Sequence, residues 1–419
     1  MSTARSGPEA PTRRVAAAVF LPFAAAYMLS YLYRSVNAVI APDLVPEFAL
    51  TPSQLGLLTS AYFLSFAAFQ LPLGLLLDRY GPRRTDGVLL MVAAAGAAVF
   101  ATAPNAATLI AGRALIGLGV SGALMSGMKA HVLWFPRARL PAMNAWLFFV
   151  GGVGMVLATL PVELLLKVTD WRALFFALAL LTVVAGAAVL RIVPERGGAT
   201  HPESLRAQLR GLCSVFAARR FWQIGLAATA SQGTNMAVQG LWSGPWLRDV
   251  AGLGREAAAT HLLIMAAATM TGFLLWGNLA AWLARLGISV ARVFAAGLGL
   301  FLLVQSVLVM NLPLAPALIW VGYGLFGTVG SLSYAVLSYA FPRHLAGRVS
   351  TALNALVFGW AFVVQWAIGG IIQLWPVLDG GYHVGGYRAA FGVFLALQVL
   401  AFGWMLLDGQ RLRGSTAAA

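Results

Sequence analysis

Two arginines stand inside stretches of the chain that are otherwise apolar. Arg34 lies in the sequence Tyr31-Leu-Tyr-Arg-Ser-Val-Asn37, roughly 9 Å along a helix before Ile40. Arg113 lies about as deep in a second apolar stretch. A charge within a membrane helix costs at least ~2.5 kcal/mol, so it usually faces a cavity or a partner. Because a guanidinium can bind a carboxylate through two parallel hydrogen bonds, an anion is the ligand that these residues would recognise.

Few acidic residues are available to neutralise these arginines within the apolar stretches. Glu163 lies near the end of one stretch, and Asp43 lies beyond the end of another. This deficit predicts that the missing negative charge arrives with a bound solute. Tyr31 lies on the same helix face as Arg34 and is therefore expected to contact that solute as well. The alternative is that Arg34 extends its guanidinium to the membrane surface.

A polar stripe in the second half of the chain offers uncharged hydrogen bonds. Gln232, Asn235 and Gln239 recur at helical spacing on one face, and Trp242 follows further along the same stretch. These residues could give a substrate hydrogen bonds and an aromatic wall. Hydrogen bonding between neighbouring helices is an equally good interpretation of the stripe.

The same scarcity of acids limits where a proton could be carried. Glu163 and His261 are the titratable candidates, and Arg113 could modulate their pKa. His261 and Met265 stand one helical turn apart, which suits Cu(I), but two soft ligands do not complete a site. We therefore expect no metal centre and keep copper transport as an alternative. The single cysteine, Cys213, excludes an internal disulfide.

The elements that hold these residues must be membrane helices. The chain has 419 residues, of which 60% are hydrophobic and 10% charged, which is too little charge to cover a soluble protein. Apolar runs of about 20 residues, without the alternation of a β-barrel, recur along the whole length. We expect about twelve helices. They lie near 15–40, 54–77, 87–103, 107–133, 141–166, 172–190, 221–246, 257–283, 290–312, 314–340, 349–374 and 387–408.

The net charge of +15 indicates how the chain is oriented in the membrane and not a surface that binds nucleic acid. If the N-terminus is cytoplasmic, twenty of the 28 Lys and Arg residues fall in the tails and in alternate loops on that side. Five fall on the opposite side and three within helices. Basic residues stay in the cytoplasm during insertion, so we expect both termini to be cytoplasmic and the protein to lie in the inner membrane.

The chain divides into two similar halves. The polar segment 191–220 is the long polar stretch at the centre and includes a short amphipathic helix near 203–217. Phe135-Pro-Arg137 returns as Phe341-Pro-Arg343, and Ala142-Met-Asn144-Ala145 as Ala352-Leu-Asn354-Ala355. Such repeats are one transporter architecture, with substrate held between the halves. The predicted parts are a cytoplasmic tail 1–14, a six-helix bundle 15–190, a cytoplasmic linker 191–220, a six-helix bundle 221–408 and a tail 409–419.

The turn after the second apolar run carries a motif. Gly74-Leu-Leu-Leu-Asp78-Arg79-Tyr-Gly81-Pro-Arg83-Arg84 resembles the signature loop of the major facilitator superfamily, G-x-x-x-D-R-x-G-x-R-R. The resemblance implies an all-α membrane fold of two six-helix halves and a gating role for this turn. The gating residues it implies are Gly74, Asp78, Arg79, Gly81, Arg83 and Arg84. In the second-half copy of this turn, Ala281 and Trp282 replace the Asp and the Arg. Closure of the inner gate is therefore expected to depend more on the first-half turn.

Two further segments extend this resemblance. Arg113-Ala-Leu-Ile-Gly117-Leu-Gly119 is similar to the R-x-x-x-G-x-G segment of the fourth helix in this superfamily. The stretch around Arg34 is similar to the organic-anion symporters of the superfamily, whose first-helix arginine contacts a carboxylate. The resemblance thus implies a secondary transporter of a small organic anion, working by alternating access. A proton-coupled cycle would use Glu163, His261 or a substrate carboxyl group, and a uniporter or anion exchanger is the alternative. We expect a monomer in the lipid bilayer, without cofactors, enzymatic activity or nucleic-acid partners. An inorganic-anion porter, a copper importer and a non-transporting sensor are the alternatives.

Overall fold

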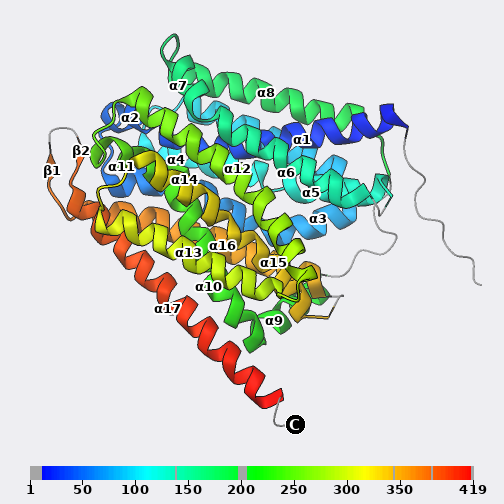
Figure 1. Cartoon of the computed structure of the whole chain (residues 1–419). Helices are drawn as coiled ribbons and strands as arrows, with labels where there is room; N and C mark the ends of the chain where they lie inside the picture. Colours follow the sequence, from blue (N-terminus) through cyan, green and yellow to red (C-terminus); the bar gives the residue numbers. More distant parts are fainter. Residues whose placement is uncertain (1–11, 137–138, 197–204, 343–344, 379–380, 417–419) are drawn as a thin grey trace, which may run out of the picture. The chain divides into compact units, whose positions relative to one another are not determined.

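The fold is almost entirely helical in the part of the chain that the computed structural model describes, with one short two-stranded hairpin. This part comprises residues 12–136, 139–196, 205–342, 345–378 and 381–416, so Arg137 and Arg343 of the repeat lie outside it. Ten helices are long and apolar enough to cross a membrane. Figure 1 shows them along the chain from α1 to α17. The all-α membrane fold expected from the sequence is confirmed.

The predicted second and third spans form one continuous helical segment, α3 (Pro52–Ala101). Gly81 breaks it with φ 75° and ψ 169°, a conformation that residues with a Cβ rarely adopt. Pro82 then starts the next helix, where its missing N–H costs nothing. The kink therefore makes two spans out of one segment and places the signature turn at their junction.

The predicted seventh span is also interrupted. It consists of α10 (Arg219–Ala237), a π turn η2 (Val238–Trp242) and α11 (Ser243–Asp249). A π turn inserts an extra residue into the helix and often marks a functional position. With this segment and the two parts of α3, all the spans expected from the sequence are present.

The described chain packs as two compact units. The first comprises residues up to Val36 and Leu64–Glu203, and the second comprises Asn37–Phe63 and Ser204 onward. The segment Asn37–Phe63 thus packs within the second unit, although it precedes the central linker in sequence. The bundle boundaries expected from the sequence stay a prediction.

The first unit is built from α1, the part of α3 from Leu64 onward and the helices that follow it. Besides that part of α3 it contains α1 (Arg13–Ser35), α4 (Ala106–Val120), α5 (Ala123–Trp134), α6 (Leu140–Leu157), α7 (Leu160–Leu166) and α8 (Trp171–Ile192). Close approach of α1 and α6 requires Gly154, because a Cβ there would collide with the carbonyl of Met28. Lipid tails are as apolar as the helix surfaces, so helices in a membrane associate through close packing, which small residues at such crossings allow.

The second unit holds the remaining elements. They are α2 (Asn37–Glu47), the start of α3, α9 (Leu205–Ala217), α10, η2, α11, α12 (Arg255–Arg285), α13 (Val290–Met310), α14 (Pro316–Gly327), the 3₁₀ turn η3 (Thr328–Ser331), α15 (Leu332–Ala340), α16 (Ala346–Ile372), β1 (Val377–Leu378), β2 (Gly381–Tyr382) and α17 (Val384–Thr416). The helix α9 confirms the short linker helix expected near 203–217.

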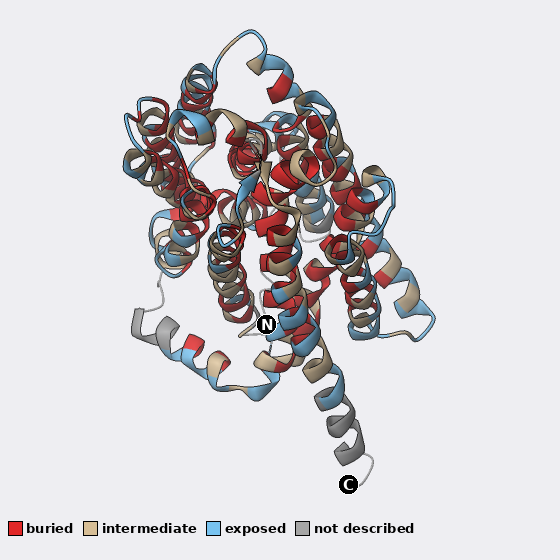
Figure 2. Cartoon of the chain, turned by 90° about the vertical axis from the view of Figure 1, so that its left-hand side faces the viewer, coloured by how far each residue is buried: buried red, intermediate tan, exposed pale blue. Residues whose placement is uncertain are grey.

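Large apolar side chains cover the outer helix faces. On α8, Leu180 and Val184 are 65% and 58% exposed, whereas Phe175 on the same helix is fully buried. Figure 2 shows this pattern of exposed and buried faces along the helices. A soluble protein rarely leaves so much contiguous apolar surface open, so these faces are the ones that contact lipid.

Candidate functional site

Arg34 lies near the end of α1 on a face that it shares with two tyrosines. Its guanidinium carbon is 3.9 Å from the ring centroid of Tyr31, and the Arg34 side chain is half-buried. Tyr31 is 8% exposed, and its hydroxyl accepts a hydrogen bond of 3.4 Å from Tyr27. A guanidinium over an aromatic face gains a cation–π contact, and its N–H groups point outward in the plane of the guanidinium, where a carboxylate can accept from them. The arrangement is suited to holding an anion beside the ring.

Arg113 has a different environment from Arg34. It is 0% exposed, and Nη1 donates a hydrogen bond of 2.9 Å to the carbonyl of Tyr33. Its guanidinium carbon lies 5.3 Å from the ring centroid of Phe100 and 5.7 Å from that of Phe175. Arg113 therefore supports the backbone of α1 directly before Arg34. Its predicted contact with substrate stays a prediction.

The polar stripe of α10 and the π turn bonds to three neighbouring helices. Gln232 donates to the hydroxyl of Ser333 at 3.1 Å, and Gln239 donates to that of Thr269 at 2.8 Å. Trp242, which is fully buried, donates from Nε1 to the carbonyl of Gln365 at 2.9 Å. Each of these three side chains thus uses one polar group to bond a neighbouring helix, which favours the interpretation that the stripe joins helices.

The stripe nevertheless keeps polar groups for other partners. Gln232 and Gln239 are only half-buried. Asn235 is 9% exposed and lies against Gly327, where a Cβ would come within 2.7 Å of its Oδ1. The stripe belongs to the second unit, whereas Arg34, Tyr31 and Arg113 belong to the first. Substrate binding by both groups stays a prediction.

The signature turn contains an ion pair that the sequence did not reveal. Asp78 Oδ1 lies 2.5 Å from Lys129 Nζ on α5, and Nζ also donates to the carbonyl of Leu77 at 2.8 Å. From the sequence alone, Lys129 reads as a water-facing residue near a helix end. The contact instead joins the turn to α5.

The arginines of the turn bind the end of α8. Nε of Arg83 donates to the carbonyl of Leu190 at 2.8 Å, and its Nη1 lies 3.6 Å from Glu195. Arg84 lies 2.5 Å from Glu195. Arg79 lies over the ring of Tyr80 at 5.2 Å. These contacts hold the turn within the first unit. A small hollow lies beside the turn and is lined by residues 80–83, 130, 133–134 and 193–196.

The predicted coupling residues have separate surroundings. Glu163 on α7 is 4% exposed. His261 on α12 hydrogen-bonds through Nδ1 to the carbonyl of Ala257 at 2.8 Å, and Met265 is 3% exposed. Within the described residues, His, Cys, Asp and Glu form no group of three that could hold a metal ion.

A half-buried carboxyl group, Asp249 at the end of α11, fixes the short hairpin of the second unit. Tyr387 donates to Asp249 Oδ2 at 2.6 Å, and the backbone N–H of Tyr382 donates to the same oxygen at 3.2 Å. These bonds attach β2 to α11 and α17.

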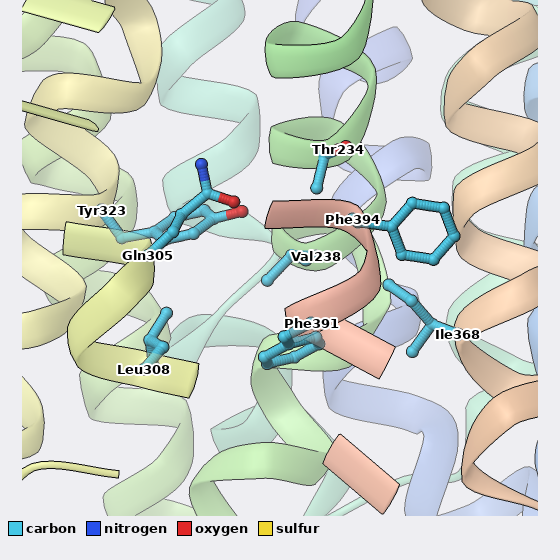
Figure 3. A pocket seen from close by; sticks show the side chains of 8 residues that line it. All are labelled: Thr234, Val238, Gln305, Leu308, Tyr323, Ile368, Phe391 and Phe394. Atoms are coloured by element: carbon cyan, nitrogen blue, oxygen red, sulfur yellow. The ribbon is translucent and has the colours of Figure 1, made fainter. Parts of the chain in front are cut away.

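The second unit also encloses a small cavity, which Figure 3 shows from close by. Its lining is mostly apolar or aromatic: Thr234, Val238, Gln305, Leu308, Tyr323, Ile368, Phe391 and Phe394. Gln305 exchanges reciprocal amide hydrogen bonds of 2.9 Å with Gln398. None of the residues expected to bind substrate lines this cavity, so it is not the predicted site.

Comparison with known families gives one match that covers most of the chain. The Major Facilitator Superfamily matches residues 23–365. This range includes α1 with Arg34, the signature turn and the polar stripe.

Three relatives differ in how much of the chain they match. An uncharacterized transporter, YybO, of Bacillus subtilis is 30% identical over 38% of this chain and 36% of its own length. A probable sulfoacetate transporter, SauU, of Cupriavidus necator is 28% identical over 36% of this chain and 35% of its own length. The niacin transporter NiaP of Acinetobacter baylyi is 24% identical over 80% of this chain and 73% of its own length. The chain thus spans about a third of the length of the first two relatives.

A solved structure has the same fold over nearly the whole chain. It is a bacterial homolog of the human lysosomal transporter Spinster, in an inward-facing and occupied conformation. The TM-score is 0.77 with 17% sequence identity, and the match covers 96% of this chain and 98% of that one. At this identity the likeness establishes the fold alone.

Proposed function

The chain belongs to the Major Facilitator Superfamily, and we propose that it transports a small organic anion across the inner membrane by alternating access. Its family makes it a multi-pass membrane protein and a secondary transporter of a small solute, not an enzyme. The anionic substrate, proton symport and a monomeric state are parts of the proposal.

One observation carries the choice of an anion. Arg34 is a half-buried guanidinium in an apolar helix, 3.9 Å from the Tyr31 ring centroid. Intramembrane charge is costly and usually functional. The names of two relatives point the same way, because sulfoacetate and niacin are both carboxylates at neutral pH.

We expect Arg34→Ala to abolish saturable uptake and Arg34→Lys to bind substrate much more weakly than wild type. Lysine keeps the charge but cannot form two parallel hydrogen bonds with a carboxylate. Loss of a charge-assisted hydrogen bond costs ~1.5–3 kcal/mol, which is ~10- to 150-fold in affinity. A thermal-stabilisation screen over small carboxylates, including niacin and sulfoacetate, selects the probe, and its affinity is then measured on the purified, folded variants.

Arg172→Lys is the matched control for this experiment. Arg172 also lies over an aromatic ring, with its guanidinium carbon 4.2 Å from the Trp171 centroid, but it stands at the start of α8 outside the predicted site. Its substitution should leave affinity unchanged. If Arg34→Ala binds the selected carboxylate as tightly as wild type, Arg34 is a packing or interfacial residue and the anion proposal fails.

A further inference from the structure

Asp86 is a buried carboxyl group for which the sequence suggested no role. It lies on the second part of α3, five residues after Gly81, and is 0% exposed. Among the residues that the structure describes, neither of its carboxyl oxygens makes a hydrogen bond of good geometry, and the hydroxyl of Ser126 on α5 is the polar group that approaches it. A buried carboxyl group so poorly paired calls for an explanation.

Apolar side chains and one hydroxyl lie close to Asp86. A Cβ on Gly122 would come within 3.2 Å of Asp86 Oδ1, and the same position is flanked by Leu73 and Leu89. These two leucines belong to a buried apolar cluster with Leu77. Ser126 on α5 supplies the neighbouring hydroxyl. An ionised carboxylate in these surroundings would have lost its water without gaining a counter-ion.

The cation that could serve as that counter-ion is already bound. Lys129 lies three residues after Ser126, so both share one face of α5. Its ammonium lies 2.5 Å from Asp78. One ammonium can neutralise one carboxylate at a time, so Asp86 needs a proton while Lys129 binds Asp78.

The other charged groups of the neighbouring segments are also engaged elsewhere. Arg83 and Arg84, on the same helix as Asp86, bind Glu195 beyond the end of α8. His131, on the same helix as Ser126, lies 2.8 Å from Asn144 on α6 through its Nδ1. These contacts pair the arginines and His131 with groups other than Asp86.

We propose that Asp86 is a proton-binding site and that its proton is the ion coupled to transport. A proton from water adds to one carboxylate oxygen and returns to water when the acid ionises, so no bond between heavy atoms changes. Asp86 is protonated while Lys129 binds Asp78. When that pair opens, Lys129 can stabilise the ionised form of Asp86, which links proton release to the gate. Only the coupling half of this proposal rests on the proposed transport function.

Infrared spectroscopy of the purified protein in lipid tests the proton site without any substrate. At neutral pH the wild type should show the C=O stretch of a protonated carboxylic acid, and Asp86→Asn should lack it. Asp170→Asn is the matched control, because Asp170 is an exposed carboxylate of the same unit that caps α8. A band that persists in Asp86→Asn, or that disappears instead in Glu163→Gln, overturns the assignment.

The link to Lys129 gives a second readout. In Asp78→Asn the ammonium is released, so the Asp86 band should disappear at a lower pH than in the wild type. An unchanged or higher pH of disappearance contradicts the link. Circular dichroism confirms that each variant is folded.

Flux in vesicles tests the coupling. With radiolabelled niacin or sulfoacetate, whichever the screen selects, Asp86→Asn should still exchange substrate across the membrane but lose accumulation driven by an imposed proton gradient. Accumulation equal to wild type overturns the coupling half. If the wild type moves neither anion, the proposed function fails and the infrared result alone decides the proton site.

Discussion

Asp78 and Lys129 form a 2.5 Å ion pair between side chains that are 40% and 25% exposed. A partly exposed pair of this kind contributes little to folding stability, typically 0–1 kcal/mol by double-mutant measurements. Lys129 also binds the carbonyl of Leu77 at 2.8 Å, so it holds the end of the helix before the turn as well as the carboxylate. The pair is therefore better suited to positioning the turn than to stabilising the fold.

We expect Asp78→Asn to reduce transport strongly while protein level and membrane insertion stay near normal. Lys129→Gln should have a similar effect, and the double variant should be no worse than either single one because both remove the same contact. Flux in vesicles and the amount of inserted protein are measured side by side. Lys167→Gln, a lysine of the same unit after α7, serves as the control. Wild-type flux in Asp78→Asn would remove the gating role.

The residues that the sequence missed lie at helix boundaries. The third span appeared to begin near 87, whereas the structure starts its helix directly after Gly81. Asp86 therefore lies one residue outside the expected span. Lys129 lies inside an expected span but near its end, where a basic residue ordinarily faces water. By contrast, Arg34 was visible from the sequence because a charge far inside an apolar run has no ordinary explanation.

The segment Asn37–Phe63 is attached to the rest of the second unit by polar contacts and by close backbone packing. Asp43 and Arg255 form a bidentate ion pair with contacts of 2.7 and 2.6 Å. The amide of Gln365 donates to the Thr59 hydroxyl at 2.5 Å. Gly369 on α16 lies so close to the carbonyl of Pro52 that a Cβ would overlap it. Backbone contact at a glycine cannot be relieved by a change of rotamer, so this packing exists only while Gly369 has no side chain.

We expect Gly369→Val to separate the start of α3 from α16. The neighbouring Gly370→Val is the control, because a Cβ there meets nothing within 4 Å. The readout is the rate at which a membrane-impermeant thiol reagent labels Ser53→Cys, since Ser53 accepts a hydrogen bond of 3.2 Å from Trp366 in this packing. The background is Cys213→Ser, which removes the single native cysteine.

Labelling should be faster in Gly369→Val than in Gly370→Val or the background protein. Equal rates in all three would mean that the contact at Gly369 does not hold this segment closed. The sequence alone does not show which of the adjacent residues Gly369 and Gly370 makes this contact, because only the packing distinguishes them.

The internal repeat has a physical counterpart in both halves of the molecule. Asn144 on α6 hydrogen-bonds to His131 of the preceding helix at 2.8 Å. Asn354 on α16 accepts a hydrogen bond of 3.0 Å from Tyr334, again on the preceding helix. The same amide position thus joins the same pair of helices in each half, although its partner differs. The sequence predicted the repeat that contains both asparagines, but not their partners, which are separated from them in sequence.

The orientation of the whole molecule in the membrane follows from where its positive charge lies. Twenty of the 28 Lys and Arg residues fall in the tails and alternate loops on one side, against five on the other. Because basic segments resist translocation, the signature turn with Asp78 should face the cytoplasm. Asp86 would then exchange its proton with the cytoplasm when the turn opens, and Arg34 would lie nearer the opposite surface.

We expect a fluorescent protein fused after Ala419 to fluoresce, because that reporter folds only in the cytoplasm, and alkaline phosphatase fused there to be inactive. Phosphatase fused at Thr169, between α7 and α8, should be active, because the expected topology puts that loop outside. The two reporters must give opposite results at each site, which controls for poor expression. Active phosphatase at the C-terminus with inactive phosphatase at Thr169 would invert the topology. In that case the Asp78 turn would face outward, and the proton carried by Asp86 would enter from the other side of the membrane.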